Sequence, residues 1–397
     1  MPIAEDRAYD EAVASDPSFP KALDRVRRDL ACIRDTPLIP RDLIDTIVWN
    51  PASAAGLGYK GKKKDNYDLA KVNALRALKD FTLYRNNYQF VPDKAFSRTQ
   101  LALRSNPKLR HVWGRAFHHI LIEGMVAQPL ISRLLAEDTP IYMGRDMHKQ
   151  MPTDIHLLIQ VGFTAFCLDF SKFDASVNSF LVETAWDIIR ELISFKDLSD
   201  HDVFDFCRTL FCKTPIVMPD GRLYYVTSGI PSGSYFTQMI DSIVNMLLIY
   251  MLLDHYNHLD TTTIKVLGDD SIFALSSMLF GFDDAKDYFA SFGMKLSDKT
   301  LTSNDFRSIT FLGHNFYGSR VTRDEFTCLS LALYSEHEMP TIMDTLIRIA
   351  SLIYDCGFND MSLHRIYRIL LHEHKIDFVN VRPVTIQPPF YTLYCIS

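Results

Sequence analysis

The stretch Lys265-Val266-Leu267-Gly268-Asp269-Asp270-Ser271-Ile272-Phe273-Ala274-Leu275 places two adjacent carboxylates between two short apolar runs. Apolar runs joined by a tight Gly-Asp turn predict a β-hairpin, with strands over 263–267 and 271–275. The hairpin would present both carboxylates at its tip, where they suit Mg²⁺, since hard cations take oxygen ligands. Gly and Asp are also ordinary turn residues, so this tripeptide alone does not establish a metal site.

A further carboxylate follows another apolar run. Residues 163–168, Phe-Thr-Ala-Phe-Cys-Leu, have the length and aromatic content of a strand, and the run ends in Asp169. An unpaired charge at the end of a buried strand is costly, and a metal ion would compensate for it. Alternatively, Asp169 could cap the helix that follows, because Asp is a favoured N-cap. The apolar periodicity resumes only near Val177, which favours the metal interpretation for Asp169 and leaves Asp174 open.

Residues 228–245 combine a loop of small residues with the start of a long helix. The loop reads Ser-Gly-Ile-Pro-Ser-Gly over 228–233, and its glycines permit positive φ and close approach to a ligand. Thr237, Asp241, Ser242 and Asn245 recur at helical spacing among apolar neighbours. Because 246–253 is then wholly apolar, we expect a mostly buried helix whose polar stripe lines a cleft.

These three segments resemble the sequence motifs of viral RNA-dependent RNA polymerases, especially those of partitiviruses and related small double-stranded RNA viruses. Motif A is matched by Asp169 and Asp174, motif B by 228–245 and motif C by 268–270, in the family's order. The resemblance implies template-directed RNA synthesis for genome replication and transcription. It also implies a two-metal transfer of rNTPs to an RNA 3′-OH.

The resemblance assigns roles to the acidic residues and to a lysine. Asp169, Asp269 and Asp270 would be catalytic and would hold two Mg²⁺ ions, for which Mn²⁺ could substitute. Residues 289–300 are similar to motif D, which makes Lys299 the expected general acid, with Lys295 as the competing candidate.

The resemblance also extends outward from the central motifs. Residues 309–316 look like the motif E hairpin, and 104–110 look like the basic motif F, with Arg104, Lys108 and Arg110 expected to bind the nucleotide. Residues 50–59 and the lysines that follow them are similar to motif G, which guides the template. The expected RNA-binding residues there are Ser53, Lys62, Lys63 and Lys64.

The recognition of the ribose departs from the family's pattern. Ser232, Thr237, Asp174, Asp241 and Asn245 are the expected nucleotide-binding residues around the sugar. Asp241 stands where the picornavirus-like pattern has Asn. A carboxylate accepts a hydrogen bond from a 2′-OH, yet Asp174 and Asp241 close together would repel each other and raise one pKa. Asn245, one turn further on, is the alternative contact.

Composition agrees with a large intracellular protein. The chain has 397 residues, is 47% hydrophobic and carries a net charge of −6, so RNA binding would depend on local basic clusters. One cluster is 60–64, and a second joins Arg98 and Arg115 to the motif F residues. The seven cysteines show no zinc-site spacing, and their odd, scattered occurrence suits a reducing compartment.

The expected surroundings follow from the resemblance and from hydropathy. We expect RNA template and product, rNTPs and a viral capsid protein as partners, in the virion interior and the host cytoplasm. No membrane partner is expected, because the start of the chain is acidic and the longest apolar run, 246–253, is too short to span a bilayer.

The periodicity predicts an α+β chain with an antiparallel sheet flanked by helices. Helices are expected over 21–34, 67–85, 114–137, 177–195, 233–255 and 340–372, the last broken near 356–360. Further strands are expected over 163–169, 215–218, 222–227 and 309–317. By resemblance to a right-hand polymerase, 1–160 would form the fingers (motifs G and F), 161–195 the palm with motif A, 196–227 a fingers insertion, 228–320 the palm with motifs B to E, and 321–397 the thumb.

Two other functions are compatible with parts of this pattern. A reverse transcriptase shares the palm, but Gly268 and the set Asp174, Asp241 and Asn245 favour ribonucleotides. A non-catalytic RNA-packaging protein with a polymerase fold is disfavoured because every catalytic acid is present.

Overall fold

The structure is a computed structural model that describes residues 3–99, 109–160, 162–277, 280–317, 320–335 and 339–376, with side chains for all of these except 3–6, 98, 99, 109, 110 and 306. Its helices are α1 (Ile3–Ser15), α2 (Phe19–Asp29), α3 (Tyr67–Tyr84), α4 (Phe117–Ala136), α5 (Met151–Leu158), α6 (Phe173–Ser176), α7 (Ser179–Leu192), α8 (Leu198–Cys212), α9 (Thr237–His255), α10 (Phe282–Ala290), α11 (Glu325–Leu333), α12 (Ile342–Asp355) and α13 (Met361–Glu373). Its strands are β1 (Thr36–Pro37), β2 (Asp93–Thr99), β3 (Leu109–Gly114), β4 (Thr164–Leu168), β5 (Ile193–Ser194), β6 (Thr214–Val217), β7 (Leu223–Val226), β8 (Ile264–Leu267), β9 (Asp270–Leu275), β10 (Leu301–Ser303), β11 (Thr310–Phe311), β12 (His314–Tyr317) and β13 (Arg320–Thr322).

An antiparallel sheet of order β10-β4-β9-β8 separates two apolar cores. On β4, Phe166 and Leu168 face the larger core, whereas Ala165 and Cys167 face the smaller one, which also contains Ile155 of α5. This alternation follows from the two-residue period of a strand. With both faces covered, β4 is buried throughout, which explains its continuously apolar sequence.

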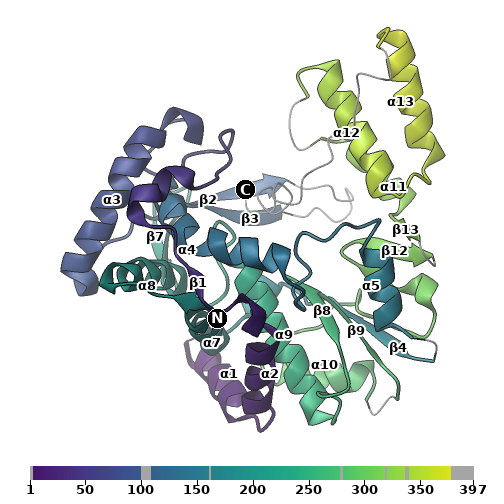
Figure 1. Ribbon diagram of the computed structural model, residues 1–397, viewed down its shortest axis with the longest axis horizontal. Helices are drawn as coiled ribbons and strands as arrows, with labels where there is room; N and C mark the ends of the chain where they lie inside the picture. The colour runs from purple at the N-terminus through teal and green to yellow at the C-terminus, as the bar shows by residue number, and fades with distance from the viewer. Residues whose placement is uncertain are drawn as a thin grey trace.

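Helix α9 is the centre of the larger core (Figure 1). Every residue from Met239 to Leu253 is buried, and the helix packs against α2, α7 and β8. A helix that is apolar on all sides requires such surroundings, and the expectation of a mostly buried helix is confirmed. Among the described residues, α9 alone is long and apolar enough to cross a membrane, but 83% of its apolar window is buried inside the protein, as in a core helix.

A second sheet, of order β3-β2-β6-β7, lies beside α3, α4 and α8 in the left half of Figure 1. Strand β2 pairs with β3 in antiparallel register, with Arg98 opposite Arg110, and with β6 in parallel. Helices α3, α4 and α8 pack on one another beside this sheet. The sheet matters for the site because β3 leads directly to the start of α4.

The C-terminal part of the described chain has its own small core. Helices α11, α12 and α13 bury Cys328, Leu346, Ile349, Leu363 and Tyr367 against one another. They form the lobe at the upper right of Figure 1, reached through β12 and β13. This arrangement separates the lobe's apolar packing from that of α9.

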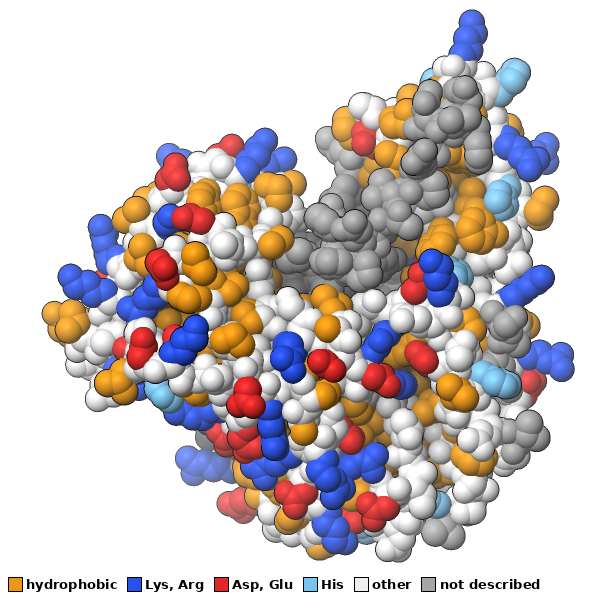
Figure 2. Space-filling view, viewed as in Figure 1, with side chains coloured by type: hydrophobic (Ala, Val, Ile, Leu, Met, Phe, Trp, Pro, Cys, Tyr) orange, Lys and Arg blue, Asp and Glu red, His pale blue; other side chains and the backbone are white. Residues whose placement is uncertain are grey.

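Acidic and basic side chains intermingle on the face shown in Figure 2. Among the ion pairs around α2, Arg27 contacts Glu191 at 2.6 Å and Lys21 contacts Asp254 at 3.0 Å. The net charge of −6 therefore does not gather into one acidic surface on this side of the molecule.

The mixed helix and sheet composition is confirmed, and most predicted helices exist with shifted ends. The predicted helix 114–137 begins only at Phe117, because Gly114 closes β3. The predicted helix 177–195 ends at Leu192, and its N-cap is Asn178, whose side chain accepts from the N–H of Leu181. Asp169 is therefore not the cap of α7.

Other elements were not predicted at all. The structure adds α1, α5, α6, α8, α10 and α11, as well as β1, β2, β3, β5, β10 and β13. The predicted strand 309–317 is in fact a hairpin of β11 and β12, as the resemblance to motif E implies. Its turn has positive φ at both Leu312 (52°) and Gly313 (71°), which is the type I′ pattern.

Candidate functional site

The predicted hairpin is present, with a two-residue turn. Leu267 of β8 lies opposite Asp270 of β9, which leaves Gly268 and Asp269 as the turn. Gly268 has φ +65°, as glycine does at the first turn position of a type II′ hairpin. The backbone conformation is what favours glycine here, because a Cβ would otherwise meet only the end of the Gln238 side chain, at 2.5 Å, and that side chain can move.

Side chains of α9 hold this turn by its backbone. Ser242 Oγ accepts from the N–H of Gly268 at 2.9 Å, and Asn245 Nδ2 donates to the carbonyls of Gly268 and Asp269 at 3.0 Å each. Ser242 and Asn245 are fully buried. The polar stripe was expected to line a cleft, but these two residues instead fix the turn that carries Asp269.

Asp169 lies next to Asp270. Leu168, the last residue of β4, pairs with Ser271 of β9. Because the two strands are antiparallel, Asp169 after Leu168 is adjacent to Asp270 before Ser271. The segment 297–300 fixes Asp169 further, since its carbonyl accepts from the N–H of Ser297 at 2.8 Å and its N–H lies 3.1 Å from Thr300 Oγ1. Ser297 Oγ also donates to the Asp169 carboxylate.

Electrostatics show that these carboxylates are close together. Burial raises the pKa of Asp270 to about 7, with further contributions from Asp269 and Asp169, whereas Lys299 opposes the shift. Crowded carboxylates of this kind are stabilised by a cation. Within the described residues, no group of three or more His, Cys, Asp or Glu side chains is arranged to hold a metal ion.

A second acidic group lies beside the first. Asp241 is 5% exposed, and burial raises its pKa well above the ordinary value, with Asp174 and Asp269 adding to the shift. The direction is the one expected for Asp174 and Asp241 in proximity. Oδ1 of Asp241 and Oδ1 of Asn245 are buried without a hydrogen-bond partner in the described structure. A buried polar atom without a partner is costly, and a ligand hydroxyl would satisfy it.

The glycine-rich loop, residues 228–236, packs on the backbone of Asp174. Ile230 donates its N–H to the Asp174 carbonyl at 2.7 Å, and Gly229 donates to Val177 at 2.9 Å. A Cβ on Gly229 would lie 2.6 Å from that same Asp174 carbonyl oxygen, and its φ is +77°. The loop's close approach to Asp174 therefore depends on this glycine.

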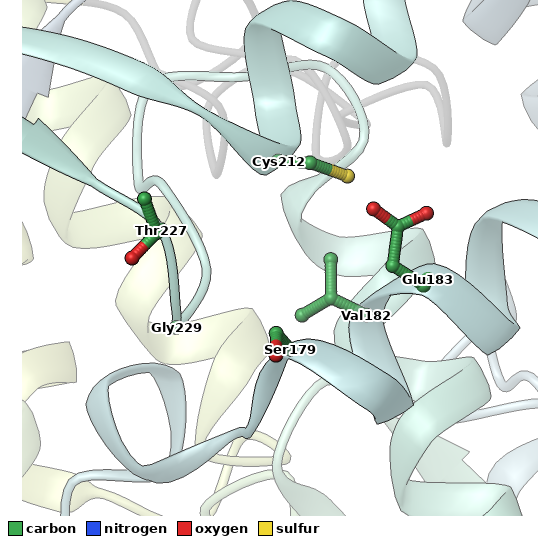
Figure 3. Close-up of a pocket in the computed structure, with 6 residues that line it drawn as sticks. All are labelled: Ser179, Val182, Glu183, Cys212, Thr227 and Gly229. Atoms are coloured by element: carbon green, nitrogen blue, oxygen red, sulfur yellow. The ribbon is translucent and has the colours of Figure 1, made fainter. Parts of the chain in front are cut away.

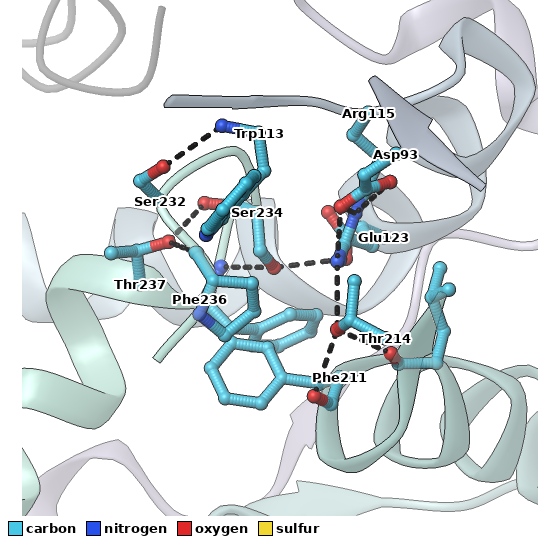
Figure 4. Close-up of polar contacts among 12 residues, drawn as sticks. Asp93, Trp113, Arg115, Glu123, Phe211, Thr214, Ser232, Ser234, Phe236 and Thr237 are labelled. Atoms are coloured by element: carbon cyan, nitrogen blue, oxygen red, sulfur yellow. Dashed lines mark hydrogen bonds and ion pairs between the residues drawn. The ribbon is translucent and has the colours of Figure 1, made fainter. Parts of the chain in front are cut away.

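The other half of the loop contacts β3 and α4 (Figure 4). Ser232 Oγ accepts from the N–H of Trp113 at 3.1 Å, and Ser234 Oγ donates to Glu123 at 2.8 Å. Thr237 Oγ1 donates back to the loop, 2.6 Å from the Pro231 carbonyl. Ser232 and Thr237 thus shape the loop in this structure, and their expected contact with a nucleotide remains a prediction.

Arg115 does not belong to the predicted basic cluster. Its side chain is fully buried and forms ion pairs with Asp93 and Glu123, which are also fully buried. A guanidinium enclosed by two carboxylates is unavailable to RNA. The sequence pattern was misleading because Arg115 follows the basic motif directly, and only the fold shows that it points inward.

The remaining basic residues of this segment are only partly described. Arg104 and Lys108 lie outside the described residues. Arg110 lies in β3 opposite Arg98, and its side chain is not described. Phe96 and His111 are exposed on the same two strands.

The expected template-guiding segment is a compact loop. Ser53 Oγ donates to the Asn50 carbonyl at 3.0 Å, and Ala54 pairs with Lys62. Lys62 and Lys64 are exposed. Lys63 instead lies over the Phe117 ring, with Nζ 5.8 Å from the ring centroid, and burial lowers its pKa to about 8. The three lysines therefore do not form one surface, because Lys63 packs against α4.

The two candidate general acids differ in their position relative to the acidic residues, and the role of either one remains a prediction. Lys299 is exposed and close enough to Asp270 to lower its pKa. Lys295 is exposed, and its carbonyl accepts from the N–H of Ser171, with no contribution to the pKa shifts of Asp241 or Asp270. Lys299 is thus the better placed of the two.

A small pocket lies behind the glycine-rich loop (Figure 3). Its lining residues are Ser179, Val182, Glu183, Cys212, Thr227 and Gly229. None of these residues is one of the predicted metal-binding carboxylates, and Gly229 is the one that belongs to the glycine-rich loop.

Several residues that position the site were not assigned a role from sequence. Ser297, Thr300 and Ser242 bind the backbone or carboxylate of the acidic residues, and Glu123 binds the glycine-rich loop. Ser242 was visible as part of the polar stripe. The other three lie far from their partners in sequence, and their role depends on tertiary contacts.

Known proteins share this pattern. Residues 9–373 match the sequence model of the family described as viral RNA-dependent RNA polymerase. The chain is 26% identical over 314 residues to the RNA-directed RNA polymerase of White clover cryptic virus 1, which covers 69% of this chain and 50% of the relative. It is 35% identical over 139 residues to that of Cryptosporidium parvum virus 1, covering 34% of this chain and 26% of the relative.

A solved structure has the same fold over the whole chain. The RNA-dependent RNA polymerase of a human picorbirnavirus superposes with a TM-score of 0.71 at 16% identity, covering 100% of this chain and 79% of the other. The chain spans half or less of the length of the two curated relatives.

Proposed function

Because the chain belongs to the viral RNA-dependent RNA polymerase family, we propose that it synthesises RNA on an RNA template by adding rNTPs to an RNA 3′-OH, for genome replication and transcription. The observation that carries the proposal is the meeting of Asp169, Asp269 and Asp270 at adjacent ends of β4, β8 and β9. The raised pKa of Asp270 supports it, since these carboxylates are close enough to interact.

Asp169, Asp269 and Asp270 would hold two Mg²⁺ ions, or Mn²⁺ in their place. Bound there, the ions would lower the pKa of the attacking 3′-OH and stabilise the charge of the leaving pyrophosphate. Neighbouring side chains hold these carboxylates in position. Asn245 and Ser242 fix the turn that carries Asp269, and Ser297 orients the Asp169 carboxylate.

Two basic residues would act on the triphosphate. Arg110 would bind the incoming nucleotide, since a planar guanidinium suits phosphate, with Lys108 and Arg104 beside it. Lys299 would give its proton to the leaving pyrophosphate, a contribution of about 10²–10⁴ in rate for general acid catalysis. Its influence on the pKa of Asp270 supports this location.

Asp241 and Asp174 would recognise the ribose. Asp241 is buried, and burial together with Asp174 and Asp269 raises its pKa well above the ordinary value, which favours the protonated form that can donate as well as accept a hydrogen bond. Asn245 uses its amide N–H groups on the turn and keeps only Oδ1 for a sugar. Asp241 is therefore the principal contact to the 2′-OH in this proposal.

The chain would be divided into the fingers, palm and thumb subdomains of a right-hand polymerase. The sheet β10-β4-β9-β8 with α9 would be the palm, the part before residue 160 together with 196–227 the fingers, and α11–α13 with the following residues the thumb. RNA would also contact Ser53, Lys62 and Lys64, which lie on the exposed loop. We also propose that the protein binds a viral capsid protein. It would act inside the virion and in the host cytoplasm.

Primer extension tests the function. The purified chain, a primed RNA template and Mg²⁺ should extend the primer with rNTPs far better than with dNTPs. Preference for dNTPs would indicate a reverse transcriptase. RNA binding without extension by the unaltered chain would favour a packaging role.

A further inference from the structure

A buried ion cluster joins β2, β3 and α4 behind the glycine-rich loop (Figure 4). Arg115, just after β3, binds Asp93 through two nitrogens at 3.0 and 3.2 Å and also pairs with Glu123. All three side chains are completely buried. A buried ion pair is expensive to desolvate and is often no better for stability than apolar packing. Its presence here therefore calls for another explanation.

Glu123 connects this cluster to the loop. One carboxylate oxygen accepts from Ser234 Oγ at 2.8 Å, and the other accepts from the N–H of Tyr235 at 3.1 Å. The oxygen that accepts from Ser234 also accepts from Arg115, so Glu123 binds the guanidinium and the end of the loop at once. Because Arg115 and Ser234 share one oxygen of Glu123, a change in the carboxylate displaces the loop and the guanidinium together.

The same segment contacts the loop through its backbone. The N–H of Trp113 donates to Ser232, and a Cβ on Gly233 would lie 1.9 Å from the Trp113 carbonyl oxygen. On its other side, the Arg115 carbonyl lies 2.5 Å from where a Cβ of Gly56 would be, and the N–H of Phe117 donates to Ala55 at 2.9 Å. Residues 113–117 therefore touch both the glycine-rich loop and the loop that contains Ser53.

We propose that Arg115, Asp93 and Glu123 are positioning residues that set the distance between strand β3, which carries Arg110, and the glycine-rich loop, which leads to Asp241. The inference rests on the proposed function, because it assigns the two connected segments to one nucleotide. Through this cluster, the phosphate-binding and sugar-binding sides of the site keep a fixed separation. None of the three residues touches the substrate.

Two variants test the cluster at different points. Ser234→Ala removes the hydroxyl that donates to Glu123 and leaves the ion pairs in place. Glu123→Gln keeps the shape of the side chain but directs an amide N–H toward the N–H of Tyr235 or the guanidinium. The matched control is Tyr250→Phe, which removes a buried hydroxyl that donates to Asp29, away from the loop and β3.

Kinetics provide the first measurement. We expect Ser234→Ala to raise the rNTP KM about fivefold, the factor that corresponds to one lost hydrogen bond, with kcat per active site and RNA affinity nearly unchanged. Glu123→Gln should raise KM more. Tyr250→Phe should lower Tm without changing KM. A lower Tm with unchanged KM in both loop variants would overturn the proposal and leave the cluster a purely structural role.

Hydrogen–deuterium exchange provides the second measurement, which needs no activity. In Ser234→Ala and Glu123→Gln, residues 228–236 and 109–116 should both exchange faster than in the unaltered chain, whereas Tyr250→Phe should change neither segment. Faster exchange in the loop alone would overturn the coupling. If the unaltered chain makes no RNA, the proposed function fails, and the exchange result still decides whether the two segments are coupled.

Discussion

Two acidic groups lie side by side at the start of α9, and their environments differ. Asp269 is exposed at the hairpin turn, and Asp169 and Asp270 are half-buried beside it with Lys299 nearby. Asp241, in contrast, is 5% exposed and has no basic neighbour among the causes of its pKa shift. In our proposal, cations neutralise the first group. In the second group, burial raises the pKa of Asp241 and favours its protonated form, which would suit the recognition of a hydroxyl that we propose.

The largest effect should come from removing a charge from the first group. Asp269→Asn keeps the shape of the turn but loses a metal ligand, so we expect RNA synthesis to fall by about 10³ or more, the scale of losing a main electrostatic contact in catalysis. Primer extension with radiolabelled rNTPs measures this. Asp283→Asn, at an exposed position on α10, is the control and should leave synthesis unchanged. Normal synthesis by Asp269→Asn would remove Asp269 from the site.

For the second group, discrimination between rNTPs and dNTPs should depend on the hydrogen bonds of residue 241 rather than on its charge. If Asp241 acts as a neutral acid, Asp241→Asn retains a donor and an acceptor and should discriminate rNTPs from dNTPs within about twofold of the unaltered chain. Asp241→Leu loses both and should reduce discrimination about tenfold, as expected for one to two lost hydrogen bonds. The ratio of kcat/KM for matched rNTP and dNTP measures this. Equal discrimination in all three proteins would exclude Asp241 from sugar recognition.

The raised pKa of Asp270 should make the stability of the metal-free protein depend on pH. Its pKa is about 7 in the folded protein, above the ordinary carboxyl value of ~4 in the unfolded chain. Between these values the folded protein holds a proton that the unfolded chain has released, so stability falls as pH rises through this window. Without metal, we expect this contribution to lower Tm as the pH rises from about 4 to about 7.

Adding Mg²⁺ and substituting Asp270 both test this explanation of the pH dependence of Tm. Mg²⁺ should restore Tm at pH 8 by replacing the proton. Asp270→Asn should raise Tm at pH 8 in the absence of metal and should flatten its pH dependence, as thermal unfolding followed by circular dichroism would show. A metal-free protein whose Tm is independent of pH in both forms would contradict the crowding of these carboxylates.

We expect the smallest loss of activity when a hydrogen bond from α9 to the Gly268–Asp269 turn is removed. Ser242→Ala removes the acceptor for the N–H of Gly268 at a fully buried position, at a cost of about 1–3 kcal/mol for the unsatisfied group. We expect a lower Tm and a several-fold lower kcat, because the turn carries Asp269. Ser15→Ala, at the exposed end of α1, serves as the control. An unchanged Tm would show that α9 does not hold the turn through this hydroxyl.

Local patterns predicted the elements that carry the chemistry. The β8–β9 hairpin was readable because a Gly-Asp turn between apolar runs has few other conformations, and α9 because its apolar residues continue for several turns. Helix α8 was overlooked, although Asp197 caps it and Val203, Cys207 and Leu210 have helical spacing. Strands β2 and β3 were overlooked because basic and polar residues interrupt their apolar pattern.

The sequence by itself determined the order of motifs that indicates a viral polymerase. It also pointed to the residues that we propose for the chemistry: the carboxylates 169, 269 and 270 and the glycines of the loops near them. Only the tertiary structure decided the state of each group. Arg115 and Lys63 look like their exposed basic neighbours in the sequence but are directed inward, and Asp241 and Asp269 are both acidic but differ in burial. Burial and distant partners determine the pKa and availability of a side chain, and those partners come from segments far apart in the chain.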